Sequence, residues 1–171
     1  MTHPLEFFYF CPHCGSEKFN PHHFNSKKCG DCGFEFYKNP APAVACFIYD
    51  EEGRLLVQRR AKDPGKGTLD LPGGFIDLDE TAEAAAIREL KEETNLDIEI
   101  ERLLFTEPNR YEWSGYDVQP LDLFYEGKVK DFSTLKRQES EVAEIMFIHK
   151  KDIRIEDFGL PSIRQALKRI L

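Results

Sequence analysis

The alternation of apolar and polar residues predicts a mixed sheet with a helix on each side. Residues 43–49 form a nearly continuous apolar run, which is typical of a strand buried on both faces. A turn at residues 50–53 separates this run from a second strand at residues 54–59, so we expect the two strands to form a hairpin. Further strands are predicted at residues 69–71, 98–107, 121–130 and 142–149, with a loop at residues 111–119.

Two segments have the period of an amphipathic helix. Residues 82–90 are rich in strong helix formers, and Ala86, Ile87 and Leu90 make an apolar stripe. Thr81 is the expected N-cap, and Asn95 should follow the helix end because Asn tolerates a left-handed backbone. A second helix should open at a proline. This is Pro161, and the apolar stripe that follows it consists of Ile163, Ala166, Leu167 and Ile170.

Three carboxylates are crowded on one face of the first predicted helix. Glu89, Glu92 and Glu93 stand at i, i+3 and i+4, so they fall within about one third of the helix circumference. Like charges at this spacing repel one another, which a purely structural helix would tend to avoid. A hard divalent cation such as Mg²⁺ or Mn²⁺ prefers such oxygen ligands. The alternative is a solvated acidic helix face.

The residues around these carboxylates resemble the Nudix box, G-x5-E-x7-R-E-U-x-E-E-x-G-U, in which U is a bulky aliphatic residue. The matching positions are Gly74, Glu80, Arg88, Glu89, Leu90, Glu92, Glu93 and Leu96, and Asn95 stands where the family has glycine. The resemblance implies an α/β protein, a Nudix α/β/α sandwich with a mixed sheet. It also implies a metal-dependent hydrolase that cleaves the phosphoanhydride bond of a nucleoside diphosphate derivative.

The resemblance further implies a set of Mg²⁺ or Mn²⁺ ligands. Glu89 and Glu93 would be the direct ligands, with Glu92 close behind. The carbonyl of Gly73 or Gly74 would complete the set, and Gly74 is our choice. We expect Glu89 to act as the general base that activates a metal-bound water.

Other charged residues are assigned supporting roles. Arg88 should orient carboxylates by bidentate pairing, with Glu80 as a candidate partner. The family often takes a base or a further metal ligand from a loop after the box, and Glu139 and Glu141 are the candidates here. A solvated loop is the alternative for both.

Five residues are candidate substrate contacts. Arg59, Arg60 and Lys66 lie at the end of the second strand and in the loop before the box, where they could meet phosphates. Exposed loop cations are the alternative. Tyr111 and Trp113 could stack on a nucleobase, or pack at the end of the sheet.

A second motif consists of two C-x2-C pairs near the N-terminus. Cys11 and Cys14 are followed by Cys29 and Cys32, the spacing of a four-thiolate zinc ribbon. Two disulfides or a redox pair are the alternatives, and a neighbouring histidine such as His13, His22 or His23 could replace one thiolate. Four thiolates close a tetrahedral site, so we expect this Zn²⁺ to be structural. Cys46 lies in an apolar run and should be a buried core thiol.

Length and charge fit a two-part chain. The 171 residues allow a small zinc ribbon at residues 1–37 and a Nudix hydrolase domain at residues 38–171. The formal net charge of −8 argues against nucleic acid and leaves a small nucleotide as the expected partner, with a homodimer left open. No apolar run approaches the 18 or so residues of a membrane span. No signal peptide is visible, so a cytoplasmic location is expected.

The combination of a zinc ribbon with a Nudix box resembles the NADH pyrophosphatase architecture. That subgroup carries S-Q-P-W-P-F-P-x-S after the box, whereas this chain has T-E-P-N-R-Y-E-W-S at residues 106–114. A nucleotide sugar such as ADP-ribose, a dinucleotide or a nucleoside triphosphate therefore stays open as substrate. The alternative function is a nucleotide-sensing regulator or adaptor that binds a partner through its ribbon.

Overall fold

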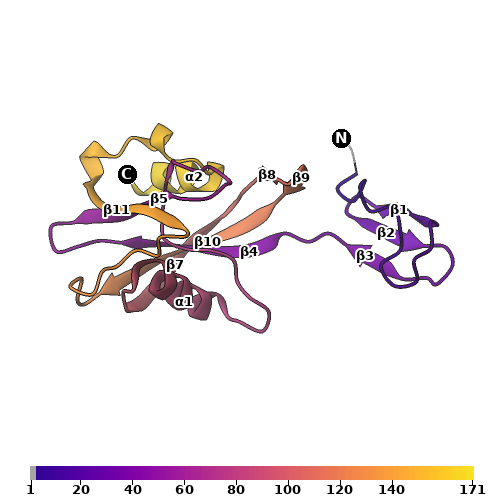
Figure 1. Cartoon of the computed structure of the whole chain (residues 1–171), viewed down its shortest axis with the longest axis horizontal. Coiled ribbons are helices and arrows are strands. Elements are labelled where there is room, and N and C mark those ends of the chain that lie inside the picture. Colours follow the sequence, from indigo (N-terminus) through magenta and orange to yellow (C-terminus); the bar gives the residue numbers. More distant parts are fainter. Residues whose placement is uncertain (1–2) are drawn as a thin grey trace. The chain divides into compact units, whose positions relative to one another are not determined.

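The computed structural model describes residues 3–171 and divides the chain into two compact units (Figure 1). One unit ends at Pro40, and the other spans Ala41–Leu171. The assignment of residues 1–37 to a ribbon domain and of residues 38–171 to a hydrolase domain stays a prediction.

The first unit is a small antiparallel sheet with very little core. Its strands are β1 (Phe19–His23), β2 (Ser26–Cys29) and β3 (Glu35–Tyr37), in the order β1-β2-β3. The buried cluster consists of Cys11, Phe19 and Cys29, with Phe34 and Phe36 packed against it. Such a cluster removes too little apolar surface from water to hold a fold by itself.

The second unit contains two three-stranded sheets. Strands β4 (Ala41–Ile48), β10 (Pro120–Val129) and β7 (Ile98–Pro108) form one, in which β10 runs parallel to β4 and antiparallel to β7. Strands β11 (Val142–His149), β5 (Arg54–Arg60) and β6 (Leu69–Asp70) form the other, which is antiparallel. The predicted α/β fold with mixed strand pairing is confirmed.

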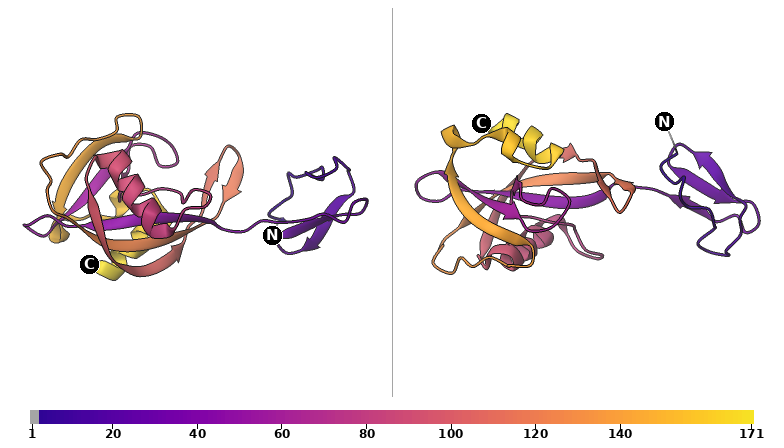
Figure 2. Two further views of the ribbon diagram at one scale, coloured as in Figure 1. Left: turned by 90° about the horizontal axis from the view of Figure 1, so that it is seen from below. Right: turned by 45° about the horizontal axis from the view of Figure 1, so that its top comes forward.

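Helices α1 (Ala82–Thr94) and α2 (Pro161–Ile170) lie on opposite sides of the strands (Figures 1 and 2). Strand β4 explains this layering, because its side chains alternate between two buried clusters. Val44, Cys46 and Ile48 pack with α1, whereas Ala45 and Phe47 pack with α2. The prediction that this strand is buried on both faces, with Cys46 in the core, is therefore confirmed.

The predicted hairpin of residues 43–59 is wrong beyond its turn. Strands β4 and β5 belong to different sheets and share only the isolated bridge between Tyr49 and Leu55. The reason lies in the hydrogen bonds of β4. One edge pairs with β10, and the backbone amides of Val44 and Cys46 donate to the carbonyls of Gly74 and Pro72, at 2.8 and 2.9 Å. The loop before α1 thus occupies an edge that β5 would otherwise use.

The predicted loop at residues 111–119 is also wrong, because this segment is a hairpin. Strands β8 (Tyr111–Trp113) and β9 (Tyr116–Val118) pair around a turn at Ser114 and Gly115. Both turn residues have positive φ, 52° and 75°. Two positive φ values match the tight turns that suit the twist of a hairpin.

The caps of α1 follow the prediction, but its buried stripe differs at one position. Thr81 Oγ1 accepts a hydrogen bond from the Ala84 amide at 3.2 Å, and Asn95 adopts a left-handed backbone with φ of 59°. Ala85 is buried in place of the predicted Ile87, which is 44 % exposed. In α2, the buried residues include Ile163, Ala166 and Leu167 as predicted. Two short 3-10 helices precede it, η1 (Lys150–Asp152) and η2 (Ile155–Asp157).

Membrane crossing by a helix finds no support within residues 3–171. None of the helices described there is both long and apolar enough to span a bilayer.

Candidate active site

Two glycines bring the loop before α1 against the first strand and against the helix. A side chain on Gly73 would place its Cβ 2.1 Å from the Val44 carbonyl oxygen. A Cβ on Gly74 would lie 2.5 Å from the carboxyl group of Glu89. Only glycine allows both approaches, so the Gly-Gly pair fixes the backbone beside the first acidic side chain of the helix.

Glu93 is buried and held by two hydrogen-bond donors. The Gly73 amide donates to Glu93 Oε2 at 2.9 Å, and Gln58 Nε2 donates to Glu93 Oε1 at 2.8 Å. Burial raises the pKa of Glu93 to about 8, although both hydrogen bonds act to lower it. The carbonyl oxygen of Gln58 is itself buried and has no hydrogen-bond partner among the residues described. A buried carboxyl group with a raised pKa is typical of functional sites.

Glu89 stands one helical turn earlier and is held from its exposed side by Arg88. Burial raises the pKa of Glu89, the guanidinium of Arg88 lowers it, and the carboxylates of Glu92 and Glu141 raise it. Arg88 Nη1 donates to Glu89 Oε1 at 2.8 Å. Its Nε and Nη2 donate to the two oxygens of Glu80, each at 2.9 Å, which is the bidentate pair expected from the sequence.

These carboxyl groups open into a cleft of about 320 Å³ in the second unit. Glu89, Glu93 and Glu141 line it together with two cations, Arg60 and Lys62. Lys62 Nζ lies 2.8 Å from Glu141 Oε1, so the cation and the carboxylate hold each other at the cleft. The cleft therefore offers acidic groups for a cation and basic groups for an anion at the same place.

A second polar group lines the same cleft and was not anticipated. Arg60 Nη1 donates to Asp70 Oδ2 at 2.5 Å. Asp122 Oδ2 accepts from Ser162 Oγ at 2.5 Å and from Asn109 Nδ2 at 2.9 Å. Burial raises the pKa of both aspartates. The available signal was one aspartate inside each of two apolar strand segments, residues 69–71 and 121–125.

The structure brings together part of the predicted site. Glu89, Glu93, Glu141, Gly74, Arg60 and Tyr111 line the cleft. Six other candidates are not among its lining residues: Arg88, Glu92, Glu139, Arg59, Lys66 and Trp113.

Arg88 is held by Glu80 and Glu89 as described above, and three more of these six have partners or surroundings that explain their position. The Glu92 side chain is 52 % exposed and lies 3.5 Å from Arg88. Glu139 borders a separate shallow hollow with Glu92 and Lys91. Arg59 pairs with Glu144 at 3.0 Å and donates to the Gly67 carbonyl. Sequence reasoning missed two residues that line the cleft. Gln58 belongs to strand β5, and Lys62 lies directly after that strand.

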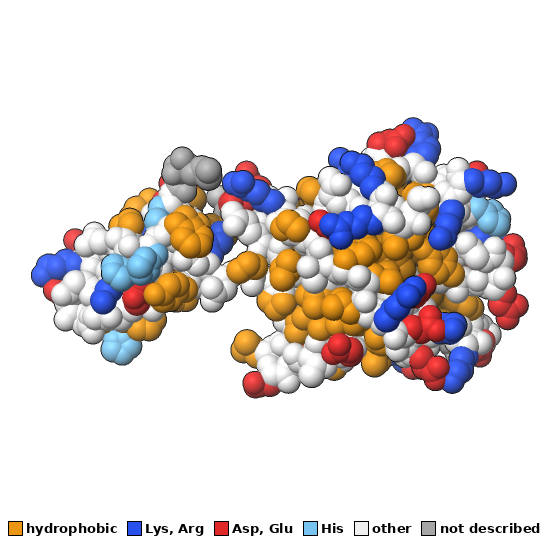
Figure 3. Space-filling view, turned by 180° about the vertical axis from the view of Figure 1, so that it is seen from behind, with side chains coloured by type: hydrophobic (Ala, Val, Ile, Leu, Met, Phe, Trp, Pro, Cys, Tyr) orange, Lys and Arg blue, Asp and Glu red, His pale blue; other side chains and the backbone are white. Residues whose placement is uncertain are grey.

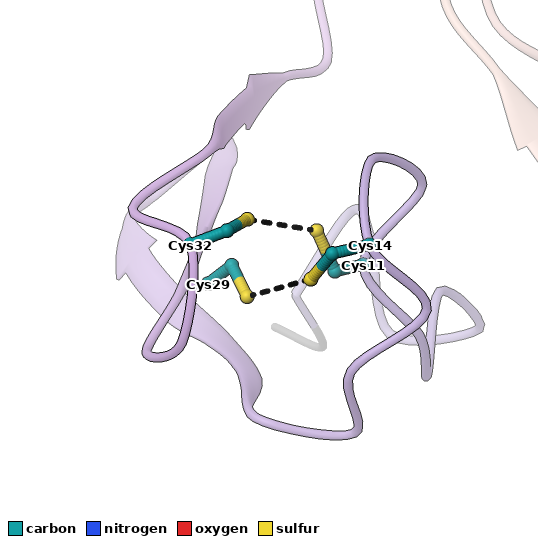
Figure 4. Close-up of side chains that lie close together, drawn as sticks. All are labelled: Cys11, Cys14, Cys29 and Cys32. Carbon is teal, nitrogen blue, oxygen red and sulfur yellow. Dashed lines mark hydrogen bonds between the residues drawn. The ribbon is translucent and has the colours of Figure 1, made fainter.

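The four cysteines of the first unit converge on one point (Figure 4). The Sγ atoms of Cys11 and Cys32 are 3.7 Å apart, as are those of Cys14 and Cys29. All four sulfurs lie within 4.8 Å of one another and are free thiols. Sulfurs bonded to one tetrahedral zinc at about 2.3 Å would be about 3.8 Å apart, whereas a disulfide needs about 2.05 Å. The donor set and its spacing therefore fit Zn²⁺.

The turns around the thiols have the form expected of zinc knuckles. Gly15 and Gly33 both have φ of 75°, and their amides donate to the carbonyls of Cys11 and Cys29. Backbone amides of Cys32 and Asp31 lower the pKa of the Cys29 thiol to about 6. Amides that stabilise a thiolate also prepare it to bind a metal.

Comparison with known proteins gives a consistent family match. The model of the NUDIX domain matches residues 39–169. The chain is 39 % identical over 79 residues to an ADP-ribose pyrophosphatase of Methanocaldococcus jannaschii, which is 45 % of this chain and 46 % of that protein. It is 31 % identical over 99 residues to the NAD-capped RNA hydrolase NudC of Vibrio atlanticus, 58 % of this chain and 36 % of that protein. The chain thus matches less than half the length of these two relatives.

A solved structure is similar over most of the chain. A crystal structure described as a NUDIX hydrolase from Nitrosomonas europaea superposes with a TM-score of 0.75 at 27 % identity. The match covers 94 % of this chain and 88 % of that one, so it includes residues of both units. A MutT protein from Methanosarcina mazei, with a TM-score of 0.62 at 24 % identity, covers 78 % of this chain and shares its fold.

Proposed function

The chain belongs to the Nudix family, and from that premise we propose that it hydrolyses the phosphoanhydride bond of a nucleoside diphosphate derivative with the help of Mg²⁺ or Mn²⁺. The observation that carries this proposal is the shared cleft. It joins the acidic side chains of Glu89 and Glu93 to the cations Arg60 and Lys62. Hydrolysis of a phosphoanhydride uses both kinds of group. The acidic side chains can bind a metal cation that neutralises the phosphate charge, and the basic side chains can hold the phosphate oxygens.

The cleft residues fit a divalent cation. Burial raises the pKa of both Glu89 and Glu93. Repulsion by Glu92 and Glu141 raises the pKa of Glu89 further, and repulsion by Asp70 and Glu89 does the same at Glu93. A cation bound there would relieve this repulsion, neutralise phosphate charge and lower the pKa of a bound water. The Gly74 carbonyl accepts from Val44 at 2.8 Å and keeps a second lone pair that a cation can use.

The chain's own residues would then divide the remaining work. Glu89 would accept the proton of the attacking water, and Arg88 would hold it in place, with Glu80 fixing Arg88 in turn. Arg60 and Lys62 would hold the phosphates. Tyr111, which borders the cleft, would stack on the base or the second moiety.

A nucleotide sugar of the ADP-ribose type is the first candidate substrate. A relative named ADP-ribose pyrophosphatase supports it, and so does the absence from this chain of the S-Q-P-W-P-F-P-x-S motif. A dinucleotide such as NADH is the second candidate. The four-cysteine cluster and the relatives named NAD-capped RNA hydrolase favour it. A nucleoside triphosphate is the third.

A nucleotide sensor without turnover is the competing function. A sensor would bind the nucleotide in the cleft and contact a partner through the first unit. Sensors do not need a complete set of box carboxylates, whereas this chain retains Glu89, Glu92 and Glu93. A cytoplasmic location and a homodimer stay predictions.

An activity panel separates these functions. The full chain is incubated with ADP-ribose, NADH and nucleoside triphosphates, with Mg²⁺ or Mn²⁺. Released phosphate is measured after a coupled phosphatase for ADP-ribose and NADH, and after a coupled inorganic pyrophosphatase for the triphosphates. We expect turnover of ADP-ribose that depends on the added cation. Nucleotide binding in a thermal-shift assay without turnover of any substrate would support the sensor instead.

A further inference from the structure

The first unit carries a second cluster of metal-binding side chains, apart from the four cysteines. His22, His23 and Glu35 each offer one ligand atom, and these atoms all lie within 4.8 Å of one another. The residues come from strands β1 and β3, which are separated by β2. His22 and His23 are exposed and Glu35 is partly buried, and Figure 3 shows histidine side chains on the surface of this unit.

A β-bulge explains how two consecutive histidines reach the same face. Side chains of neighbouring residues in a regular strand point to opposite faces of the sheet. The register of β1 against β2 shifts between Pro21 and His23, so one extra residue is inserted there. Such bulges re-aim side chains. The two imidazole rings are consequently in edge contact, with their centroids 4.3 Å apart.

Glu35 is oriented toward the histidines by neighbouring side chains. His22 Nδ1 lies 2.7 Å from Glu35 Oε1, and Ser26 Oγ donates to the same oxygen at 2.8 Å. Tyr37 hydrogen-bonds to the same carboxylate and stacks on His23, with ring centroids 6.5 Å apart. Outer hydrogen bonds of this kind orient the ligands of a metal.

We propose that His22, His23 and Glu35 form a second transition-metal site, which binds Zn²⁺ or a similar ion and leaves at least one coordination position open to solvent. Two imidazoles and one carboxylate suit Zn²⁺, Ni²⁺ or Cu²⁺, whereas Mg²⁺ prefers oxygen ligands alone. Bonds of about 2.0–2.1 Å would need only small rotations of the two exposed rings. The ion would connect β1 directly to β3 and stiffen a unit that has little core.

A plain ion pair between His22 and Glu35 is the competing explanation. It accounts for the 2.7 Å contact. It gives no role to the bulge, to the ring of His23 beside that of His22, or to the contacts that Tyr37 makes with two members of the cluster, Glu35 and His23. The two explanations differ in one measurable quantity, which is the number of zinc ions bound.

The test counts zinc on the untagged full chain in the presence of millimolar Mg²⁺. Magnesium occupies oxygen-ligand sites such as the cleft and competes poorly for imidazole. We expect one zinc that survives dialysis and a second, weaker one seen by calorimetry. His22→Ala and His23→Ala should each lose the second zinc and keep the first. Retention of the first zinc also shows that the unit is still folded. His149→Ala is the control, since His149 is an exposed residue at the end of β11 in the second unit and lies outside both clusters.

A spectroscopic readout identifies the ligands independently. Protein with its zinc retained is titrated with Co²⁺, and the ring protons of His22 and His23 should shift strongly while those of His149 do not. Glu35→Gln should weaken the second site about tenfold or more and leave the first zinc in place. A wild-type chain that binds only one zinc would overturn the proposal. So would a second zinc that persists in both His22→Ala and His23→Ala.

Discussion

The four-cysteine cluster and the carboxylate cleft gather their metal-binding side chains in different ways. The cysteines come from two short turns, each closed by a local backbone bond at Gly15 or Gly33. The cleft takes residues from helix α1, from strands of both sheets and from the connections between them. The cysteines lie in a unit whose buried apolar cluster has three members, whereas the cleft is lined by residues of two extensive apolar clusters.

The comparison suggests that the two metals have opposite relations to folding. The first unit has too little apolar burial to fold alone, so its proposed zinc would contribute most of its stability. The second unit has its own core, so its proposed Mg²⁺ or Mn²⁺ would serve the reaction and have less effect on the fold. Four predictions can break or sharpen this contrast.

The largest expected effect is loss of the first unit when one thiolate is removed. Cys29→Ser should abolish tight zinc binding and unfold that unit, because structural zinc contributes about 10–16 kcal/mol in zinc-finger peptides. Metal analysis gives the zinc content, and amide NMR spectra report each unit separately. The second unit should keep its dispersed signals and its Mg²⁺-dependent activity.

Cys46→Ala is the matched control, since Cys46 is fully buried beside α1 in the second unit. It should keep zinc and weaken the second unit by about 1 kcal/mol. If activity stops when zinc is chelated and returns only with Zn²⁺, the division into structural zinc and catalytic magnesium is wrong.

The next largest effect concerns turnover. Glu89→Gln and Glu93→Gln should each lower kcat by roughly 10²-fold or more, because a base or a metal ligand is lost. Steady-state assays at saturating Mg²⁺ on the best substrate of the panel measure this. Glu101→Gln, on the surface of β7, should retain activity. Both cleft variants turning over like the wild type would contradict the proposed mechanism.

The contrast between the two sites also shows what the sequence could predict. The cysteine motif is local, and the four sulfurs meet as their spacing indicated. The box helix is local as well, so Thr81, Asn95 and the Arg88–Glu80 pair were all anticipated. Such contacts join residues less than about ten positions apart in the sequence, so the geometry of one helix or turn is enough to predict them.

Features that depend on long-range packing were missed. The hairpin of β4 and β5 failed because the box loop and β10 take the hydrogen bonds of β4, and strand patterns do not specify pairing. Glu92 shares a helix face with Glu89, but the helix turns it outward. Gln58 and Asp122 reach the cleft only because the sheets bring β5 and β10 beside α1 and α2. No local pattern marks Gln58, and the only local signal of Asp122 is its place inside an apolar strand segment.

A smaller effect is expected from Gln58, which tests this long-range part of the site. Gln58→Leu removes the donor that holds Glu93 at 2.8 Å. Loss of such outer support lowers metal affinity about 10–100-fold, so the Mg²⁺ concentration for half-maximal activity should rise by that factor. At saturating Mg²⁺ kcat should largely recover. Gln165→Leu on the exposed face of α2 is the control. An unchanged Mg²⁺ dependence would mean that Gln58 only fills space.

The smallest effect is a pH dependence of the second unit's stability without Mg²⁺. The pKa of Glu93 is raised by burial from 4.5 to about 8 in the folded chain. Between these values the folded protein holds a proton that the unfolded chain has released. The free energy of unfolding should therefore fall as pH rises, by at most about 1.4 kcal/mol per pH unit. This contribution is complete below pH 4.5 and lost above about pH 8.

Urea unfolding followed by Trp113, the single tryptophan, measures this in the second unit. Glu89, Asp70 and Asp122 also have raised pKa values and shift stability in the same direction, so the comparison with Glu93→Gln isolates one group. In Glu93→Gln, the free energy of unfolding should fall less steeply with pH between pH 5.5 and 7.5 than it does in the wild type. Added Mg²⁺ needs the ionised carboxylate, so it should stabilise the wild type more at the higher pH. Equal slopes for both proteins would show that Glu93 is not the group that couples protons to this cleft.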